Sequence, residues 1–268
     1  MYVIKADGQE EEFQPDKIIK TCLRADASIE TAREIAEEIS KNLQEGTTTH
    51  EIYEMILSGL RKRRDRSSLL FTLRESISKL DSRCFELYAK KILEAHGYKC
   101  KWNVIVRGRS VEHQVDIIAA DIKMFLVECK HHVNYHRFCS LGNLLQVQAR
   151  LEDIKDGFRD GKNKYDFDYA WMLTNTKFSE HAKMYAEAKD IRLTGWRYKD
   201  EDALESLIQS NKLFPLTILR CSAEMKRYLL NNEIITLKDL MDADMNKLKG
   251  IEKAKLEGLI RQAEKLLS

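Results

Sequence analysis

The sequence predicts an α/β (α+β) protein of several domains: a β-hairpin with a helical bundle, a central mixed sheet flanked by helices, and an all-α module. Its 268 residues exceed a typical single domain of about 100–150 residues. Short extended runs and stretches of helical spacing succeed one another in three blocks. With two prolines, 43% hydrophobic and 33% charged residues, the chain has enough apolar material to fold almost throughout. We expect domains at residues 1–80, 81–198 and 204–268.

Composition also limits the compartment and the partners. The start MYVIKADGQE is no signal peptide, and no run approaches the roughly 20 apolar residues of a membrane-spanning helix. The six cysteines lie far apart without a C-x-x-C pair, which favours reduced thiols over zinc or disulfides. We therefore expect a cytoplasmic protein with no membrane partner.

The first block combines a hairpin with helices. Extended runs on either side of Asp7-Gly8 predict two short paired strands. Pro15-Asp16 predicts the start of a helix that reaches Arg24. Apolar residues at helical spacing predict further helices within 31–43, 50–60 and 68–80.

The second and third blocks differ in strand content. The second predicts a helix ending before Gly97, strands at 102–106, 115–120, 124–129, 168–174 and 191–196, and helices at 138–154 and 179–189. From about residue 204 the pattern predicts only helices, four or five short ones.

Charged residues stand in the middle of two apolar strands of the second block. If 115–120 and 124–130 form a hairpin with 121–123 at its tip, Asp116 lies opposite Glu128, and Lys130 shares the face of Glu128. Paired carboxylates can hold Mg²⁺, a nearby lysine can orient water, and Glu86 on the preceding helix could reach the same place. An exposed hairpin with one salt bridge would show the same spacing.

Residues 85–196 resemble the Mrr-like branch of the PD-(D/E)xK, or restriction-endonuclease-like, nuclease superfamily. The resemblance rests on Phe85-Glu86, Val115-Asp116-Ile117-Ile118-Ala119, Glu128-Cys129-Lys130 and Thr174-Asn175-Thr176-Lys177-Phe178-Ser179. It implies DNA cleavage with Mg²⁺ or Mn²⁺. It further implies Asp116, Glu128, the backbone carbonyl of Cys129 and possibly Glu86 as metal ligands, with Lys130 as the catalytic lysine and Glu86 in the catalytic set.

The amino-terminal block resembles an ATP-cone, a nucleotide-sensing domain. The likeness lies in Val3-Ile4-Lys5, Asp7-Gly8, Phe13, Pro15-Asp16-Lys17-Ile18 and Thr49-His50-Glu51-Ile52. It implies a regulatory ATP or dATP lined by Lys5, Glu11, Gln14, Lys17, Thr49, Tyr53, Phe71 and Arg74. A helix start and nearby lysines suit phosphate oxygens. An oligomerisation module without ligand is the alternative.

The carboxy-terminal block resembles a helix-hairpin-helix module. Leu237-Lys238-Asp239-Leu240 and the stretch from Leu248 to Lys255, with Lys249, Gly250 and Ile251 at the turn, carry the likeness. Such a turn would bind DNA phosphate through backbone N–H groups. A protein-binding or structural role remains an alternative.

These features predict a Mg²⁺-dependent DNA endonuclease that ATP or dATP regulates, as a homodimer or higher homo-oligomer. Residues 1–60 carry a net charge of −7 and residues 61–198 a net charge of +9, which suits a DNA partner for the middle of the chain. One alternative is a structure-selective nuclease that cuts Holliday junctions or flaps rather than duplex DNA. Another is a nucleotide-responsive DNA-binding regulator without turnover.

Overall fold

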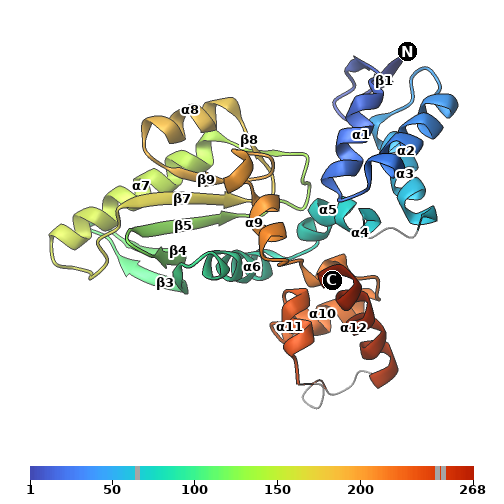
Figure 1. The fold of residues 1–268 in the computed structure, drawn as a ribbon. Helices are drawn as coiled ribbons and strands as arrows, with labels where there is room; N and C mark the ends of the chain where they lie inside the picture. Colours follow the sequence, from blue (N-terminus) through green and yellow to red (C-terminus); the bar gives the residue numbers. More distant parts are fainter. Residues whose placement is uncertain (64–66, 245–247, 249–251) are drawn as a thin grey trace. The chain divides into compact units, whose positions relative to one another are not determined.

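A computed structural model describes residues 1–63, 67–244, 248 and 252–268. The chain divides into two compact units, Met1–Leu73 and Arg74–Ala263, and the last residues of the chain are split between them (Figure 1). In the described residues no helix is long and apolar enough to cross a membrane.

The first unit is the expected hairpin with helices. Strands β1 (Tyr2–Ile4) and β2 (Glu10–Glu12) pair antiparallel, and Gly8 takes a φ of +83° in the turn. Three longer helices follow: α1 (Pro15–Arg24), α2 (Ile29–Asn42) and α3 (Thr49–Lys62). Thr48 and Glu51 form a capping box that fixes the start of α3. The core gathers apolar side chains from the hairpin and these helices, among them Val3, Ile18, Cys22, Ile35, Ile39 and Leu60.

The expected helix over 68–80 is two short helices. They are α4 (Ser67–Phe71) and α5 (Leu73–Ser78), with a turn at Thr72. Serine and β-branched threonine have low helix propensity, which explains the weak continuity of this segment. Residues 61–66 hold five basic side chains, and two of them, Arg64 and Arg66, lie outside the described residues.

The second unit is built on a five-stranded mixed sheet of order β3-β4-β5-β7-β9 (Figure 1). The β3-β4 and β4-β5 pairs are antiparallel, whereas β5-β7 and β7-β9 are parallel. The strands are β3 (Lys99–Arg107), β4 (Glu112–Ala120), β5 (Met124–Lys130), β7 (Tyr169–Thr174) and β9 (Arg192–Thr194). A second parallel pair that the pattern did not predict joins β6 (Phe138–Cys139) to β8 (Lys177–Phe178).

Helices cover this sheet. Buried residues of α7 (Leu141–Arg159) and α8 (Glu180–Ala188) form one core with Val106, Leu126 and Met172 of the strands. Helix α6 (Ser82–Ala95), capped by Asp81, packs along β3, β4 and β5. The predicted mixed sheet flanked by helices is thereby confirmed.

The carboxy-terminal block is helical, as expected, and residues 204–263 belong to the same compact unit as the sheet. The Tyr88 hydroxyl of α6 donates to the carbonyl of Leu213 at 2.6 Å, and Lys91 pairs with Asp239 at 2.8 Å. The elements are η1 (Asp200–Asp202), α9 (Leu204–Ser210), η2 (Leu216–Ile218), α10 (Ala223–Asn231), α11 (Leu237–Asp242) and α12 (Lys253–Leu267). The expected phosphate-binding turn at Lys249, Gly250 and Ile251 lies outside the described residues.

Candidate active site

The two carboxylates predicted from the hairpin lie where β4 and β5 part. The β4–β5 ladder runs from Ala120–Met124 to Ile117–Val127, so the next step of the register would pair Asp116 with Glu128. At that step the Asp116 carboxylate accepts the N–H of Cys129 at 2.8 Å. The side chain of Asp116 thus satisfies a main-chain donor of the neighbouring strand.

Strand β4 is irregular at Asp116. Val115 and Ile118 both belong to the core under α7 although they are three residues apart, whereas strict alternation would place them on opposite faces. The β3 residue facing this point, Asn103, has a φ of +53°, in the left-handed region. At this point the Asp116 carboxylate reaches the Cys129 N–H of β5, which simple alternation does not predict.

Burial and mutual repulsion make the paired negative charges costly. Burial, followed by the charge of Asp116, raises the pKa of Glu128 to about 7. Burial also raises the pKa of Asp116, against the lowering effect of the Cys129 N–H and of the positive charges of Arg150 and Lys130. Carboxyl groups with raised pKa values beside a lysine are typical of functional sites.

Arg150 is the site residue that the sequence did not single out. It stands on α7, and its guanidinium donates to the Glu128 carboxylate and, at 3.3 Å, to the carbonyl of Gln114. A signal existed in the sequence: Arg150 lies three residues after Val147 and four before Ile154, both in the buried stripe of α7. A charge at that spacing is a candidate for a partner on the sheet.

The chain that follows Lys130 is held by the end of β7. Thr174 donates its hydroxyl to the carbonyl of Lys130 at 2.7 Å. The fully buried Asn175 side chain accepts the N–H of His132 at 2.9 Å and donates to its carbonyl at 2.8 Å. Thr174 and Asn175 therefore fix the main chain at the end of β5, from which the Lys130 side chain extends.

Glu86 lies on α6 and is held by β3. Its carboxylate accepts the indole N–H of Trp102 at 2.9 Å. Burial raises the pKa of Glu86, and the charge of Asp116 adds to the effect. Glu86 therefore feels the Asp116 carboxylate electrostatically while its own hydrogen bond goes to Trp102.

The donor set suits Mg²⁺, which in proteins uses one or two carboxylates and keeps several waters. Asp116 and Glu128 offer carboxylate oxygens whose charges are poorly compensated, as their raised pKa values indicate. Across the part of the chain that the structure describes, no group of three or more His, Cys, Asp or Glu side chains is arranged as a metal site. A cation here would need a main-chain carbonyl, such as that of Cys129, and water to complete its shell.

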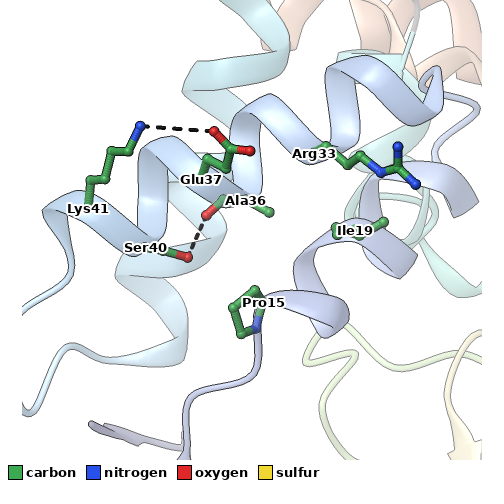
Figure 2. A pocket seen from close by; sticks show the side chains of 7 residues that line it. All are labelled: Pro15, Ile19, Arg33, Ala36, Glu37, Ser40 and Lys41. Atoms are coloured by element: carbon green, nitrogen blue, oxygen red, sulfur yellow. Dashed lines mark hydrogen bonds and ion pairs between the residues drawn. The ribbon is translucent and has the colours of Figure 1, made fainter.

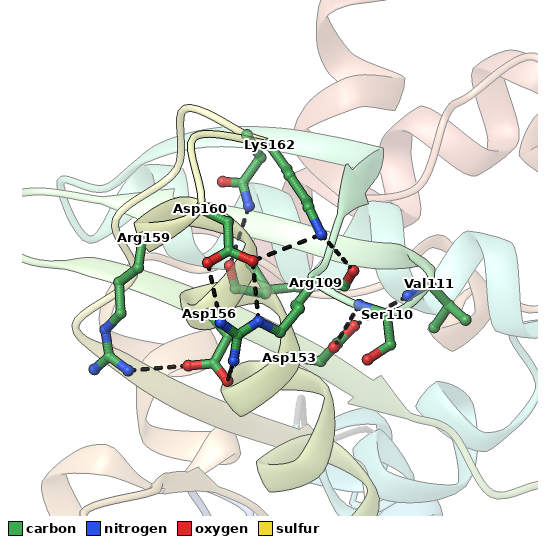
Figure 3. Close-up of polar contacts among 10 residues, drawn as sticks. Arg109, Ser110, Val111, Asp153, Asp156, Arg159, Asp160 and Lys162 are labelled. Carbon is green, nitrogen blue, oxygen red and sulfur yellow. Dashed lines mark hydrogen bonds and ion pairs between the residues drawn. The ribbon is translucent and has the colours of Figure 1, made fainter.

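A set of polar contacts, here called the polar clamp, holds α7 against the β3–β4 turn (Figure 3). Arg150 stands on the same helix, three residues before Asp153. The Asp153 carboxylate accepts the N–H groups of Ser110 and Val111 in the β3–β4 turn and a ring nitrogen contact from His113 at 2.8 Å. These contacts, the one with His113 foremost, hold the pKa of Asp153 well below its usual range. Gly157 lies so close to this turn that an added Cβ would stand 2.6 Å from the carbonyl carbon of Gly108.

In the first unit the structure brings several of the expected nucleotide-site residues together. Lys5 and Lys17 both pair with Glu11, the former at 3.3 Å, and these contacts lower the pKa of Glu11. Tyr53 stacks on Phe71 with ring centroids 4.6 Å apart. Gln14 is the N-cap of α1 and Thr49 the first residue of α3, next to the bridge between Ile4 and Thr48.

Arg74 is placed in the second unit. Its guanidinium lies over the rings of Tyr135 and Trp196, at 5.3 and 5.5 Å, and donates to the carbonyl of Tyr135. Burial, helped by Arg197, lowers its pKa to about 10. Arg74 thus supports the loop that follows Lys130, and its assignment to the nucleotide stays a prediction.

A cavity of about 300 Å³ lies between α1 and α2 (Figure 2). Its lining is Pro15, Ile19, Arg33, Ala36, Glu37, Ser40 and Lys41. None of the eight residues expected at the nucleotide is among them.

Comparisons with known proteins agree with this architecture. Residues 1–72 match the family model of the ATP cone domain, and residues 77–207 match a restriction endonuclease family model. An uncharacterized protein of Archaeoglobus fulgidus is 36% identical over 180 residues, which cover 66% of this chain and 98% of that protein. Another uncharacterized protein of that organism is 48% identical over 44 residues, covering 16% of this chain and 94% of its own length.

A solved structure is also similar. The crystal structure of AF1548, a protein of unknown function, covers 70% of this chain and 98% of its own, with a TM-score of 0.60 and 33% sequence identity.

Proposed function

We propose that this chain, which belongs to the same family as the 36%-identical archaeal protein and joins an ATP-cone domain to a restriction-endonuclease-like domain, is a Mg²⁺-dependent DNA endonuclease regulated by ATP or dATP. The observation that carries the proposal is the pair of half-buried carboxylates, Asp116 and Glu128. Lys130 lies two residues after Glu128 on β5, the spacing of side chains on one face of a strand. Two partly buried negative charges this close together are unfavourable in free energy, and such pairs are typical of sites that bind a cation or carry out a reaction.

The residues divide the work of phosphodiester hydrolysis. Asp116, Glu128 and the carbonyl of Cys129 would hold Mg²⁺, which lowers the pKa of bound water and neutralises phosphate charge when bound. Lys130 orients the attacking water and donates to a phosphate oxygen. Glu86, held by Trp102, positions water on the side of α6.

In the first unit the lysines around Glu11 suit a triphosphate. Lys5 and Lys17 would exchange the Glu11 carboxylate for phosphate oxygens, at the amino-terminal end of α1. Thr49 and Gln14 stand at helix starts nearby, and the stacked Tyr53 and Phe71 offer an aromatic surface to the base. Occupancy by ATP or dATP would then alter cleavage or assembly.

The test is cleavage of plasmid and branched DNA with Mg²⁺ or Mn²⁺, with and without ATP and dATP. Lys130→Met should lower the rate at least about a hundredfold, the range for losing one electrostatic group of an active site. Lys123→Met is the matched control, because Lys123 stands in the β4–β5 turn and pairs with Asp168 at 3.3 Å. Equal cleavage by the wild type and Lys130→Met would remove Lys130 from the site.

The substrates separate the remaining possibilities. Cleavage of Holliday junctions or flaps without cleavage of linear duplex would identify a structure-selective nuclease. The ion pair that Arg150 makes with Glu128 favours a second candidate, a nucleotide-responsive DNA-binding regulator without turnover, because it occupies one of the two carboxylates. Tight DNA binding with no cleavage of any substrate would select it.

Two further proposals concern partners. Cutting both strands of a duplex needs two sites or two visits by one site. We infer a homodimer or higher homo-oligomer, which supplies the two sites and which sedimentation of the full chain with and without dATP would test. The carboxy-terminal helices would bind DNA as a helix-hairpin-helix module. Loss of DNA affinity in Lys255→Glu would support that role, and unchanged affinity would leave them a structural or protein-binding one.

A further inference from the structure

The Arg150–Glu128 contact joins three elements at the candidate active site. Arg150 comes from α7, Glu128 from β5, and Gln114, whose carbonyl Arg150 also contacts, from β4. The exposed fraction of the side chain is only 28% for Arg150 and 24% for Glu128. The guanidinium therefore lies within the site, beside the carboxylate that the proposed function assigns to the cation.

This ion pair differs from the one that fixes the same helix three residues further on. Asp153 gains enough from His113 and two N–H groups that its pKa falls well below the usual range. The half-buried Glu128 carboxylate instead contacts the long side chain of Arg150 and lies one register step across from a second carboxylate, Asp116. The first contact is fixed by main-chain donors, whereas the second depends on a flexible side chain that a cation can replace.

We propose, on the basis of the function proposed above, that Arg150 competes with the divalent cation for the Glu128 carboxylate. A cation that binds Glu128 must displace the guanidinium or share the carboxylate with it, and two positive charges at one carboxylate repel each other. The clamp at Asp153 keeps α7 in place during the exchange, so only the Arg150 side chain has to move. Arg150 thereby sets how tightly the site holds its metal.

The test is the affinity of the full chain for Mn²⁺ alone at pH 8, measured by electron paramagnetic resonance without DNA or nucleotide. Removing the competing charge in Arg150→Gln should tighten Mn²⁺ binding at least tenfold. Arg150→Lys, which keeps the charge, should stay within threefold of the wild type. Arg159→Gln is the matched control, because Arg159 lies on the same helix, pairs with Asp156 and should leave the affinity unchanged. A variant that merely damaged the site would bind Mn²⁺ more weakly, so the sign of the change is diagnostic.

A second measurement needs no loss of Arg150. The ¹⁵Nε signal of Arg150, assigned by its absence in Arg150→Lys, should shift as Mg²⁺ is added to the wild type. Unchanged Mn²⁺ affinity in Arg150→Gln, or a signal that ignores Mg²⁺ while Glu128→Gln still abolishes binding, would overturn the competition and leave the nuclease proposal standing. If neither the wild type nor any variant binds Mn²⁺, both proposals fall.

Discussion

Replacing Glu128 with glutamine should stabilise the second unit while it removes a group assigned to the metal. The carboxyl has a pKa of 4.5 as its ordinary value and about 7 in the folded protein. Because the folded protein binds this proton more tightly than the unfolded chain, the group's contribution to stability falls as the pH rises from about 4.5 to about 7. Above pH 7 the ionised side chain opposes folding.

The size of the effect follows from the two pKa values. Each pKa unit corresponds to about 1.4 kcal/mol, so the difference between 4.5 and about 7 amounts to at most about 3.5 kcal/mol. The side chain retains 24% of its exposure, and solvent screens part of the charge. We therefore expect Glu128→Gln to raise the free energy of unfolding by about 1–3 kcal/mol at pH 8, and by about zero near pH 4.5.

Urea unfolding in metal-free buffer at pH 5, 6, 7 and 8 measures this difference. Tryptophan fluorescence reports on the second unit alone, because the three tryptophans, Trp102, Trp171 and Trp196, all lie in it. Glu152→Gln, an exposed change on α7, should stay within about 0.5 kcal/mol of the wild type at every pH. A Glu128→Gln variant that is less stable than the wild type at pH 8, or a gain that does not change with pH, would refute the account of the site.

Three further predictions test the packing of α7, the main-chain contacts after β5 and the proposed nucleotide site. Gly157→Ala should lower the free energy of unfolding in urea by about 2–4 kcal/mol, because its Cβ would meet backbone atoms at 2.6–2.8 Å. Gly142→Ala is the control and should be neutral, because the nearest atom to its Cβ is 3.7 Å away. Equal free energies of unfolding for the two variants would contradict the close approach at Gly157. Asn175→Ala should cost about 2–3 kcal/mol, because the N–H and C=O of His132 lose their partner, and amide exchange at His132 that stays as slow as in the wild type would argue against this. Lys17→Ala should weaken dATP binding at least about tenfold by calorimetry, the cost of one charge-assisted contact, whereas Lys62→Ala at the far end of α3 should not, and equal losses would point to charge in general.

Local pattern predicted the elements that carry the candidate site. The alternation of apolar residues around 121–123 predicted the β4–β5 hairpin, and the ladder confirms its register from Ile117 to Ala120. Continued by one residue on each strand, the same register places Asp116 opposite Glu128. Helix starts and stops were readable from Pro15-Asp16 and Gly97, because caps and turns depend on neighbours in the sequence.

The sequence by itself determined the fold class, the order of the main helices and strands and the candidate carboxylates, because hydrophobic period and turn chemistry act over a few residues. Only the tertiary structure decided what surrounds those carboxylates. Arg150 reaches Glu128 from a helix 22 residues further along the chain, and Asn175 holds His132 across 43 residues. The left-handed Asn103 opposite Asp116 breaks the alternation that the pattern assumes. These contacts depend on how a helix and three strands pack together, and no local period encodes that packing.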